Sequence, residues 1–302
     1  MTDDGVAATR AWLKAMIAVV VWGASFIATK VALNDLSPVT VVWLRFGIGV
    51  IILASVVGVR HQFHRIPLRT LGYFGFLGLL GITFHQWLQS TGLQTARATT
   101  TAWIVTTIPV FMALLARVIL HERLGWMGIG GIAVAALGVL VIVSEGSISS
   151  LFSGSAWTTG DVLVLASAPN WALFSILSRK GLKEHPAPVM MFYVMTAGWL
   201  CTSVLFAAGG GMAELGHVSP ASWVSIAFLG ILCSGIAYIF WYDGLKALPA
   251  GRVGSLIYLE PLVAMVVAAI VLSEAITPAG VGGGALILAG VWIVGRNEGM
   301  RE

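Results

Sequence analysis

Apolar stretches of about 20 residues, separated by short polar segments, run along the whole chain. A helix of this length crosses a bilayer core roughly 30 Å thick. The pattern therefore predicts ten membrane-spanning helices joined by short connections, with no room for a separate soluble domain. The predicted spans are 12–33, 38–58, 70–91, 98–119, 127–144, 161–180, 188–208, 221–243, 250–272 and 278–295.

The composition agrees with this pattern and excludes a water-soluble protein. Of the 302 residues, 58% are hydrophobic and 10% are charged, whereas a soluble domain carries roughly 25% charged residues. The net charge of +4 does not indicate a nucleic-acid partner, because the basic residues lie in short loops between apolar stretches. The predicted fold class is an all-α integral membrane protein with the lipid bilayer as its main partner.

The distribution of basic residues predicts the orientation in the membrane. Ten spans put both termini on the same side. If that side is the cytoplasm, only Lys30, Arg45 and Arg97 lie on or near the outside, and the other fourteen of the 17 lysines and arginines (17 − 3) face inward. Cytoplasmic loops are enriched in Lys and Arg. We therefore expect a multi-pass protein with both termini in the cytoplasm.

The two halves of the chain, residues 12–144 and 161–295, repeat one another. Spans four and five match spans nine and ten at a fixed offset of 152 residues, and the first span matches the sixth at an offset of 149. Each half has five spans, an odd number, so the second half enters the membrane from the opposite side. Such inverted repeats are common in transporters, where two mirrored halves meet around a central site. The matching pairs include Pro109 and Pro261, Glu122 and Glu274, Gly128 and Gly280, Gly138 and Gly290, and Trp22 and Trp171.

The positions of two of these pairs predict structural or mechanical roles. Glu122 and Glu274 each stand just ahead of a helix, where a carboxylate stabilises a helix N-terminus or a loop. Pro109 and Pro261 fall near the middle of predicted spans, where a proline removes a backbone hydrogen bond and bends the helix. The prolines are candidates either for a bend that the fold requires or for a hinge in the pathway.

Four motifs occur in order along the chain: Trp22-Gly23-Ala24-Ser25-Phe26 through Lys30, Pro38 with Arg45-Phe46, Pro109 with Glu122-Arg123-Leu124, and Glu260-Pro261 with Ser273-Glu274. Together they resemble the EamA type of the drug/metabolite transporter superfamily. The resemblance implies a ten-helix bundle with a central cavity that moves small metabolites across the bacterial inner membrane, often outward. Among characterised relatives the chain looks most similar to amino-acid exporters, including those for aromatic amino acids. In the second half, the corresponding stretch Asn170-Trp171-Ala172-Leu173-Phe174 lacks the Trp-Gly pair of the first-helix motif.

Polar and aromatic side chains near the middle of a span are candidates to line a pathway, because they are costly in lipid. Aromatic walls with amide partners suit a zwitterion that has an apolar side chain, through stacking, cation–π contact and hydrogen bonds. The alternatives are interfacial anchoring for Trp and Tyr, and simple packing for the histidine. The candidate substrate-binding residues are Trp22, His85, Gln86, Trp103, Asn170, Trp171, Tyr238 and Tyr258.

Two ionisable residues at depth are candidate proton or charge sites. Glu260 aligns with Ile108 of the first half, so it is not part of the repeated pattern. It could carry a proton or hydrogen-bond a neighbouring helix. Because Tyr258 lies about 200° away around an α-helix, both can face one cavity only if Pro261 distorts the backbone. Arg45 could attract a carboxylate or pair with a helix end.

These observations favour a secondary transporter that exports amino acids or related small metabolites by alternating access. A multidrug or other metabolite carrier of the same fold is the first alternative, and a non-transporting membrane sensor or structural protein is the second. The spans contain no ATP-binding loop and no clustered catalytic or metal-ligating motif, so we expect no enzyme activity, no cofactor and no metal. Gly280 and Gly284, spaced for close helix packing, leave both a monomer and a homodimer open.

Overall fold

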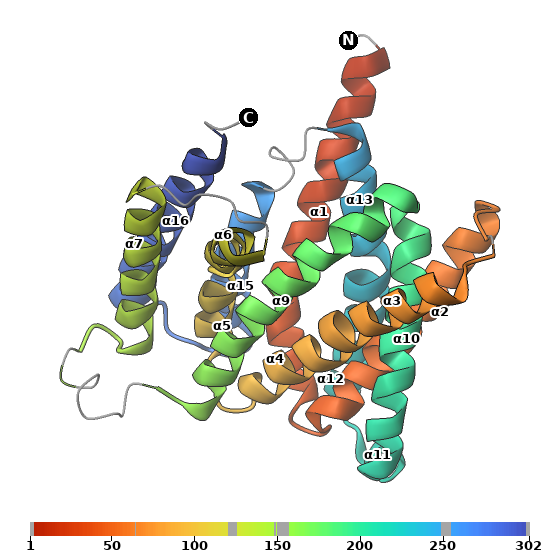
Figure 1. Cartoon of the computed structure of the whole chain (residues 1–302). Coiled ribbons are helices and arrows are strands. Elements are labelled where there is room, and N and C mark those ends of the chain that lie inside the picture. The colour runs from red at the N-terminus through yellow and green to blue at the C-terminus, as the bar shows by residue number, and fades with distance from the viewer. Residues whose placement is uncertain are drawn as a thin grey trace.

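The computed structural model describes residues 3–63, 65–119, 126–147, 149, 157–248 and 255–299, and these residues form helices and turns without any strand (Figure 1). The predicted all-α class is confirmed for this part of the chain. In the first half the elements are α1 (Asp3–Ala32), α2 (Pro38–Val59), α3 (Leu68–Gly78), η1 (Leu79–Phe84), α4 (His85–Leu93), α5 (Ala98–Val105), α6 (Ile108–Ile119) and α7 (Trp126–Val143). In the second half they are α9 (Thr159–Glu184), α10 (Ala187–Ala208), α11 (Gly211–Glu214), η2 (Leu215–His217), α12 (Pro220–Ala227), η3 (Phe228–Ile236), α13 (Ala237–Ala247), η4 (Ser255–Leu259), α15 (Glu260–Val271) and α16 (Pro278–Gly299).

Seven helical segments of the described chain are long and apolar enough to cross a membrane. Their bounds agree with the predicted spans to within a few residues. Two shorter apolar helices, Leu256–Val271 and Pro278–Ile293, cover the last two predicted spans. The third predicted span is helical from Leu68 to Leu93 without being among the seven. An integral membrane protein is thus confirmed, and the count of ten spans stays a prediction. The seven segments are Thr9–Ala32, Pro38–Val59, Ala98–Leu115, Trp126–Val143, Thr159–Glu184, Ala187–Ala208 and Pro220–Gly244.

The two repeated prolines stand at helix starts, which corrects the expectation of bends within continuous helices. Helix α5 ends at Val105, residues 106 and 107 form a turn, and α6 begins at Ile108, so Pro109 is the second residue of α6. Pro261 is likewise the second residue of α15, after the 3₁₀ segment η4. A proline costs no hydrogen bond in the first turn, where the backbone N–H groups lack helical partners. Each half therefore contains a helix that is interrupted midway, and a hinge role for the prolines stays a prediction.

Two π-helical segments, η1 and η3, interrupt the third helix of each half at corresponding positions. In both cases a side chain from the first helix of the other half donates to a backbone carbonyl of the segment. Asn170 Nδ2 donates to the Leu80 carbonyl at 2.9 Å, and Trp22 Nε1 donates to the Cys233 carbonyl at 3.2 Å. Segments of π-helix disturb the regular i→i−4 ladder. The two side chains compensate for that disturbance.

Helices of one half pack mainly against helices of the other. Helix α1 contacts α12, η3, α13 and α15, while α9 contacts η1, α4, α5 and α6. Helices α7 and α16 lie together at one side of the bundle (Figure 1). Their backbones approach so closely that an added Cβ at Gly138 would lie 2.6 Å from the Gly283 carbonyl oxygen. Small residues of this kind let backbones meet in a membrane. The other helices surround the centre, where the candidate site lies.

Candidate functional site

A cavity of about 380 Å³ lies between the two halves of the chain. Its walls come from α1, α2, α4, the end of α5, α6, α9, α10, α13, η4 and α15, and none of its lining residues belongs to α7 or α16. The cavity reaches Leu182 near the end of α9 and Met190 near the start of α10, at the end of the bundle where α1 also begins. Its polar and aromatic lining residues are Trp22, Ser25, Phe26, Arg45, His85, Gln86, Gln89, Thr106, Trp171, Phe174, Ser175, Ser178, Tyr238, Trp241, Tyr242, Tyr258 and Glu260.

Aromatic rings form two walls of this cavity, one from each half's first helix. The Trp22 ring contacts Tyr238 and Trp241, with centroid distances of 5.4 and 5.3 Å. The Trp171 ring contacts His85 at 4.7 Å and Phe174 at 4.9 Å. Phe174 fits against Gly81, where an added Cβ would lie 2.4 Å from the ring. Two of the three predicted tryptophans, Trp22 and Trp171, thus lie on corresponding walls.

Polar side chains from α2 and α4 meet at the cavity wall. Arg45, only 5% exposed, donates from Nε to Ser234 Oγ at 3.2 Å and from Nη1 to Gln86 Oε1 at 3.3 Å. His85 lies beside Gln86, and its Nδ1 is 3.1 Å from the Ser167 carbonyl oxygen. Within the described residues, Arg45 forms no ion pair with a carboxylate. A buried guanidinium without a counter-ion is costly, and its position at a cavity wall offers a place for an anionic group.

Glu260 and Tyr258 both line the cavity, although they are only two residues apart in the sequence. The backbone is a 3₁₀-helix up to Leu259 and an α-helix from Glu260 onward, so the 200° separation of a regular α-helix does not apply. The first turn of α15 is held close to α1, because Gly23 has no side chain there. A Cβ at Gly23 would lie 2.7 Å from the Glu260 carbonyl oxygen and 2.8 Å from Val263 Cβ.

Two of the candidate residues, Trp103 and Asn170, are absent from the cavity lining. Trp103 is buried in an apolar cluster with Ile142 and Ile287 and rests against Gly284, where a Cβ would lie 2.4 Å from its ring. Asn170 is directed to the Leu80 carbonyl. The packing of α5 against α16 holds Trp103 away from the cavity, and the hydrogen bond to η1 holds Asn170 away from it. Trp22, His85, Gln86, Trp171, Tyr238 and Tyr258 do line one cavity, together with Arg45, Glu260 and Pro109.

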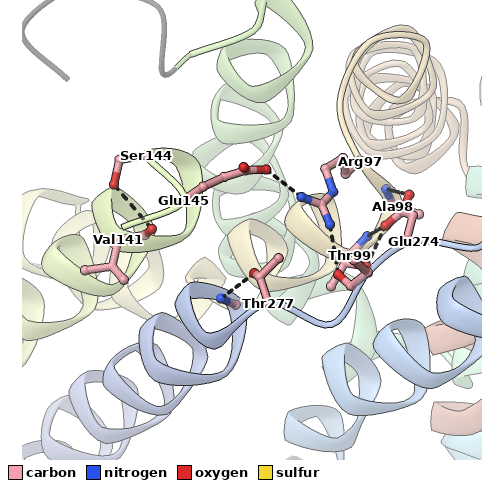
Figure 2. Close-up of polar contacts among 10 residues, drawn as sticks. Arg97, Ala98, Thr99, Val141, Ser144, Glu145, Glu274 and Thr277 are labelled. Atoms are coloured by element: carbon pink, nitrogen blue, oxygen red, sulfur yellow. Dashed lines mark hydrogen bonds and ion pairs between the residues drawn. The ribbon is translucent and has the colours of Figure 1, made fainter. Parts of the chain in front are cut away.

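Carboxylates bridge the two halves at the end of the bundle opposite the chain termini. Glu274, in the turn between α15 and α16, accepts hydrogen bonds from the backbone N–H groups of Ala98 and Thr99 and from Thr99 Oγ1, at 2.9, 3.1 and 2.6 Å (Figure 2). It therefore caps α5 of the other half, and α16 is capped by Thr277, whose Oγ1 accepts from the Gly280 N–H. The structural role predicted for Glu274 is consistent with these contacts. Glu122, its counterpart, lies outside the described residues.

Further contacts strengthen the same end. Arg97 donates to Glu145 at 2.6 Å and to the Ala275 carbonyl at 3.0 Å (Figure 2), and Lys30 donates to the Ala96 carbonyl. Partial burial raises the pKa of Glu274, but hydrogen bonds from Thr99 and Ala98 and the Lys30 charge outweigh burial, so that this pKa lies below its ordinary value. Bonds that favour the ionised form lower a carboxyl pKa.

Asp35 and Glu214 form the remaining bridges at this end. Asp35, after α1, accepts from the Ser219 N–H at 2.9 Å, from the Ser219 hydroxyl, and from Ser222 Oγ at 2.7 Å, at the start of α12. The hydrogen bonds from Ser219 and Ser222 hold the pKa of Asp35 below its ordinary value. Glu214 accepts from the Ser37 N–H at 2.8 Å, at the start of α2. Carboxylates of each half thus hold helix starts of the other half.

Methionines complete the cavity at positions that the pattern of polar residues does not reveal. Met112, Met190 and Met191 line it beside the aromatic walls. An apolar side chain that faces a cavity looks the same in sequence as one that faces lipid or a neighbouring helix. No polar signal marks these residues, and only the rotation of α6 and α10 brings them to the cavity.

Comparison with known proteins identifies the architecture. The EamA-like transporter family model matches residues 9–144 and again residues 158–296. A solved crystal structure superposes with a TM-score of 0.66 at 21% sequence identity, over 94% of this chain and 98% of the other, which supports the same fold.

Curated relatives cover almost the full length. A protein of Streptantibioticus cattleyicolor, named a probable terminal-alkyne amino-acid exporter, is 31% identical over 289 residues, 93% of this chain and 92% of the relative. A probable amino-acid metabolite efflux pump of Escherichia coli is 26% identical over 287 residues, 92% of each chain. An uncharacterized transporter of Archaeoglobus fulgidus is 26% identical over 294 residues, 96% of this chain and all of the relative. With a matching family model over both halves and a central cavity in a membrane-spanning bundle, this chain belongs to the EamA-like transporter family and is a membrane transporter and not an enzyme.

Proposed function

We propose that this chain is a secondary transporter that exports amino acids or related small metabolites. The observation that carries the proposal is the cavity between the two halves that has aromatic walls, a buried cation and a carboxyl group in its lining. Its volume of about 380 Å³ is within the usual range for small-molecule sites. Two relatives that match over more than nine-tenths of the chain carry names of amino-acid or amino-acid-metabolite exporters.

The transport cycle that we propose is alternating access between two inverted five-helix repeats, residues 12–144 and 161–295. The contacts of α1 with α12, α13 and α15 have counterparts in those of α9 with α3, α4 and α6, as an inverted repeat requires. The interrupted helices at Pro109 and Pro261 and the π segments η1 and η3 occur at corresponding positions in both halves. These correspondences support the proposal that one half rocks against the other.

The conformation described here is, in this proposal, open toward the cytoplasm. The cavity extends to the end of the bundle that carries the chain termini, and the Asp35, Glu214 and Glu274 bridges join the halves at the other end. The bias of basic residues supports a cytoplasmic position of the termini, in a protein that we propose lies in the bacterial inner membrane. Opening to the outside then requires these three bridges to break.

A counterflow assay tests the proposed function. Full-length protein reconstituted in liposomes is preloaded with one unlabelled amino acid at a time, and uptake of the same labelled compound is measured with and without a proton gradient. We expect counterflow for at least one amino acid, strongest for those with apolar or aromatic side chains. A gradient that changes net transport, but not counterflow, would indicate proton coupling. If cationic drugs or other metabolites exchange and no amino acid does, the chain is a carrier of another substrate class.

A further inference from the structure

A buried guanidinium with unused donors faces the cavity from α2. Arg45 is 5% exposed, and its Nε and Nη1 each donate one hydrogen bond, to Ser234 and Gln86. An arginine has five N–H donors, so these two bonds leave the rest of the fork for another acceptor. Its guanidinium also lies 5.0 Å from the Phe46 ring centroid. Ser234, Gln86 and Phe46 therefore fix the orientation of the fork without neutralising its charge.

A carboxyl group without a hydrogen-bond donor faces the same cavity from the first residue of α15. Among the described residues, the Glu260 side chain has no hydrogen-bond or ion-pair partner, although Glu260 lines the cavity. The close approach of α1 at Gly23 fixes the backbone at Glu260. A carboxyl group held in this way, inside a membrane protein, is a functional candidate by default.

The two groups share one cavity but are not paired with each other. They lie beyond ion-pair distance, because Arg45 and Glu260 form no salt bridge. Tyr238 lines the same cavity as both. Neither Arg45 nor Glu260 has a charged counterpart at the equivalent position of the other half, so the repeated fold does not require either charge. Helices α2 and α10 begin 149 residues apart (187 − 38), so Arg45 corresponds to the buried Val194, and Glu260 corresponds to Ile108.

We propose that Arg45 binds the α-carboxylate and Glu260 binds the α-ammonium group of a zwitterionic amino acid, and that the two together determine the class of substrate. An arginine fork matches the geometry of a carboxylate. A ligand that carries both charges on one carbon can contact two protein charges that are too far apart to neutralise each other. The aromatic walls at Trp22 and Trp171 then receive the side chain. This assignment rests on the proposed amino-acid transport.

Ligands that lack one of the two charges test the assignment. The probes are L-phenylalanine, phenethylamine, which lacks the carboxylate, and 3-phenylpropionate, which lacks the ammonium group. Binding is measured by titration calorimetry on the full-length protein in detergent. We expect Arg45→Gln to weaken L-phenylalanine and 3-phenylpropionate by about tenfold or more and to change phenethylamine by less than about threefold. We expect Glu260→Gln to weaken L-phenylalanine and phenethylamine and to spare 3-phenylpropionate.

Conservative variants keep the test valid if a charge removal prevents folding. Arg45→Lys retains the buried charge and loses the fork, and Ser234→Ala removes one support of the fork; both should weaken the two carboxylate ligands selectively. Equal weakening of all three ligands, or none, in the Arg45 and Glu260 variants would overturn the assignment. If the wild type exchanges amino acids while the variants keep its pattern of ligand affinities, the charge assignment fails and the proposed function stands. A wild type that exchanges no amino acid defeats the proposed function itself, and the assignment with it.

Discussion

The side-chain amide of Asn170 donates a 2.9 Å hydrogen bond to the backbone carbonyl of Leu80, which belongs to the π-helical segment of the opposite half. A polar residue in the middle of a membrane helix is thus accounted for without a substrate. We expect Asn170→Ala to lower the free energy of unfolding by about 0.5–1.5 kcal/mol, because it removes one buried hydrogen bond and leaves the Leu80 carbonyl with the His85 N–H as its donor. Thermal unfolding of the purified protein measures this effect.

A cavity residue on the same helix provides the control for Asn170. Ser175 lines the cavity and donates to the Trp171 carbonyl within its own helix, at 2.8 Å. Ser175→Ala should therefore change stability by less than about 0.5 kcal/mol. The interpretation of Asn170 fails if its alanine variant keeps wild-type stability but loses affinity for the transported amino acid.

Gln86 and Trp103, both predicted as substrate-binding residues, should respond in different ways to truncation. Gln86 lines the cavity and accepts from Arg45, so Gln86→Ala should reduce counterflow while the yield of folded protein is kept. Trp103 packs in the apolar cluster around α5, α7 and α16, so Trp103→Ala should cost about 3–5 kcal/mol of stability. Counterflow normalised to folded protein separates the two effects. A Trp103 variant that folds normally and has altered substrate preference would contradict the packing role and support a substrate-binding role for this residue.

Stability should fall in acid through the bridges at Asp35 and Glu274. Both pKa values are lowered in the folded protein, so each carboxylate contributes stability above its unfolded pKa of about 4, and this contribution is lost as pH falls through the folded pKa. Asp35→Asn and Glu274→Gln should both be less stable than the wild type at pH 7, and for Glu274→Gln the weakened cap of α5 should cost about 1 kcal/mol. The difference should shrink below about pH 4.

The matched control for these bridges is Glu184, at the end of α9. It is exposed and has no hydrogen-bond partner in the part of the chain that the structure describes. Glu184→Gln should leave the unfolding temperature unchanged across the same pH range. A loss at pH 7 as large as that of the Glu274 variant would mean that surface charge, and not the bridge, determines stability.

The approach of α1 to α15 depends on Gly23. An alanine Cβ there would lie 2.7 Å from the Glu260 carbonyl oxygen and 2.8 Å from Val263 Cβ, so Gly23→Ala should destabilise the protein by about 1–3 kcal/mol. At Gly72 an added Cβ meets nothing within 4 Å, and Gly72→Ala should be neutral or stabilise by up to about 1 kcal/mol. Chemical or thermal unfolding of the two variants side by side provides the comparison, and equal stability of both would contradict the close helix contact.

The inverted repeat can be tested at two positions that correspond at the 149-residue offset. Asn34 follows α1 and Lys183 lies in the last turn of α9, and both are exposed. In a variant with Cys201 and Cys233 replaced, a cysteine at Asn34 should react with an impermeant maleimide from outside intact cells. A cysteine at Lys183 should react only after the membrane is opened. Labelling of both from the same side would contradict opposite orientations of the two halves.

Much of the architecture was predictable because its signals are local in the sequence. Hydropathy identified the helical ranges, since the bilayer requires one apolar stretch for each crossing. The offset of 152 residues also related Thr106 to Tyr258, and both residues line the cavity. The 3₁₀ and π segments were not predicted, because they depend on contacts such as that of Trp22 with the Cys233 carbonyl, 211 residues away.

The sequence by itself determined the class of protein, the approximate bounds of its helices and the set of polar and aromatic residues from which a cavity could be built. Only the tertiary structure decided which of them face that cavity. Trp103 rests on Gly284 and Glu274 caps α5, although both partners lie more than 170 residues away along the chain. The rotation of a helix about its own axis is set by packing against helices that are distant in sequence, and a polar side chain at depth is satisfied equally well by a cavity or by a backbone carbonyl.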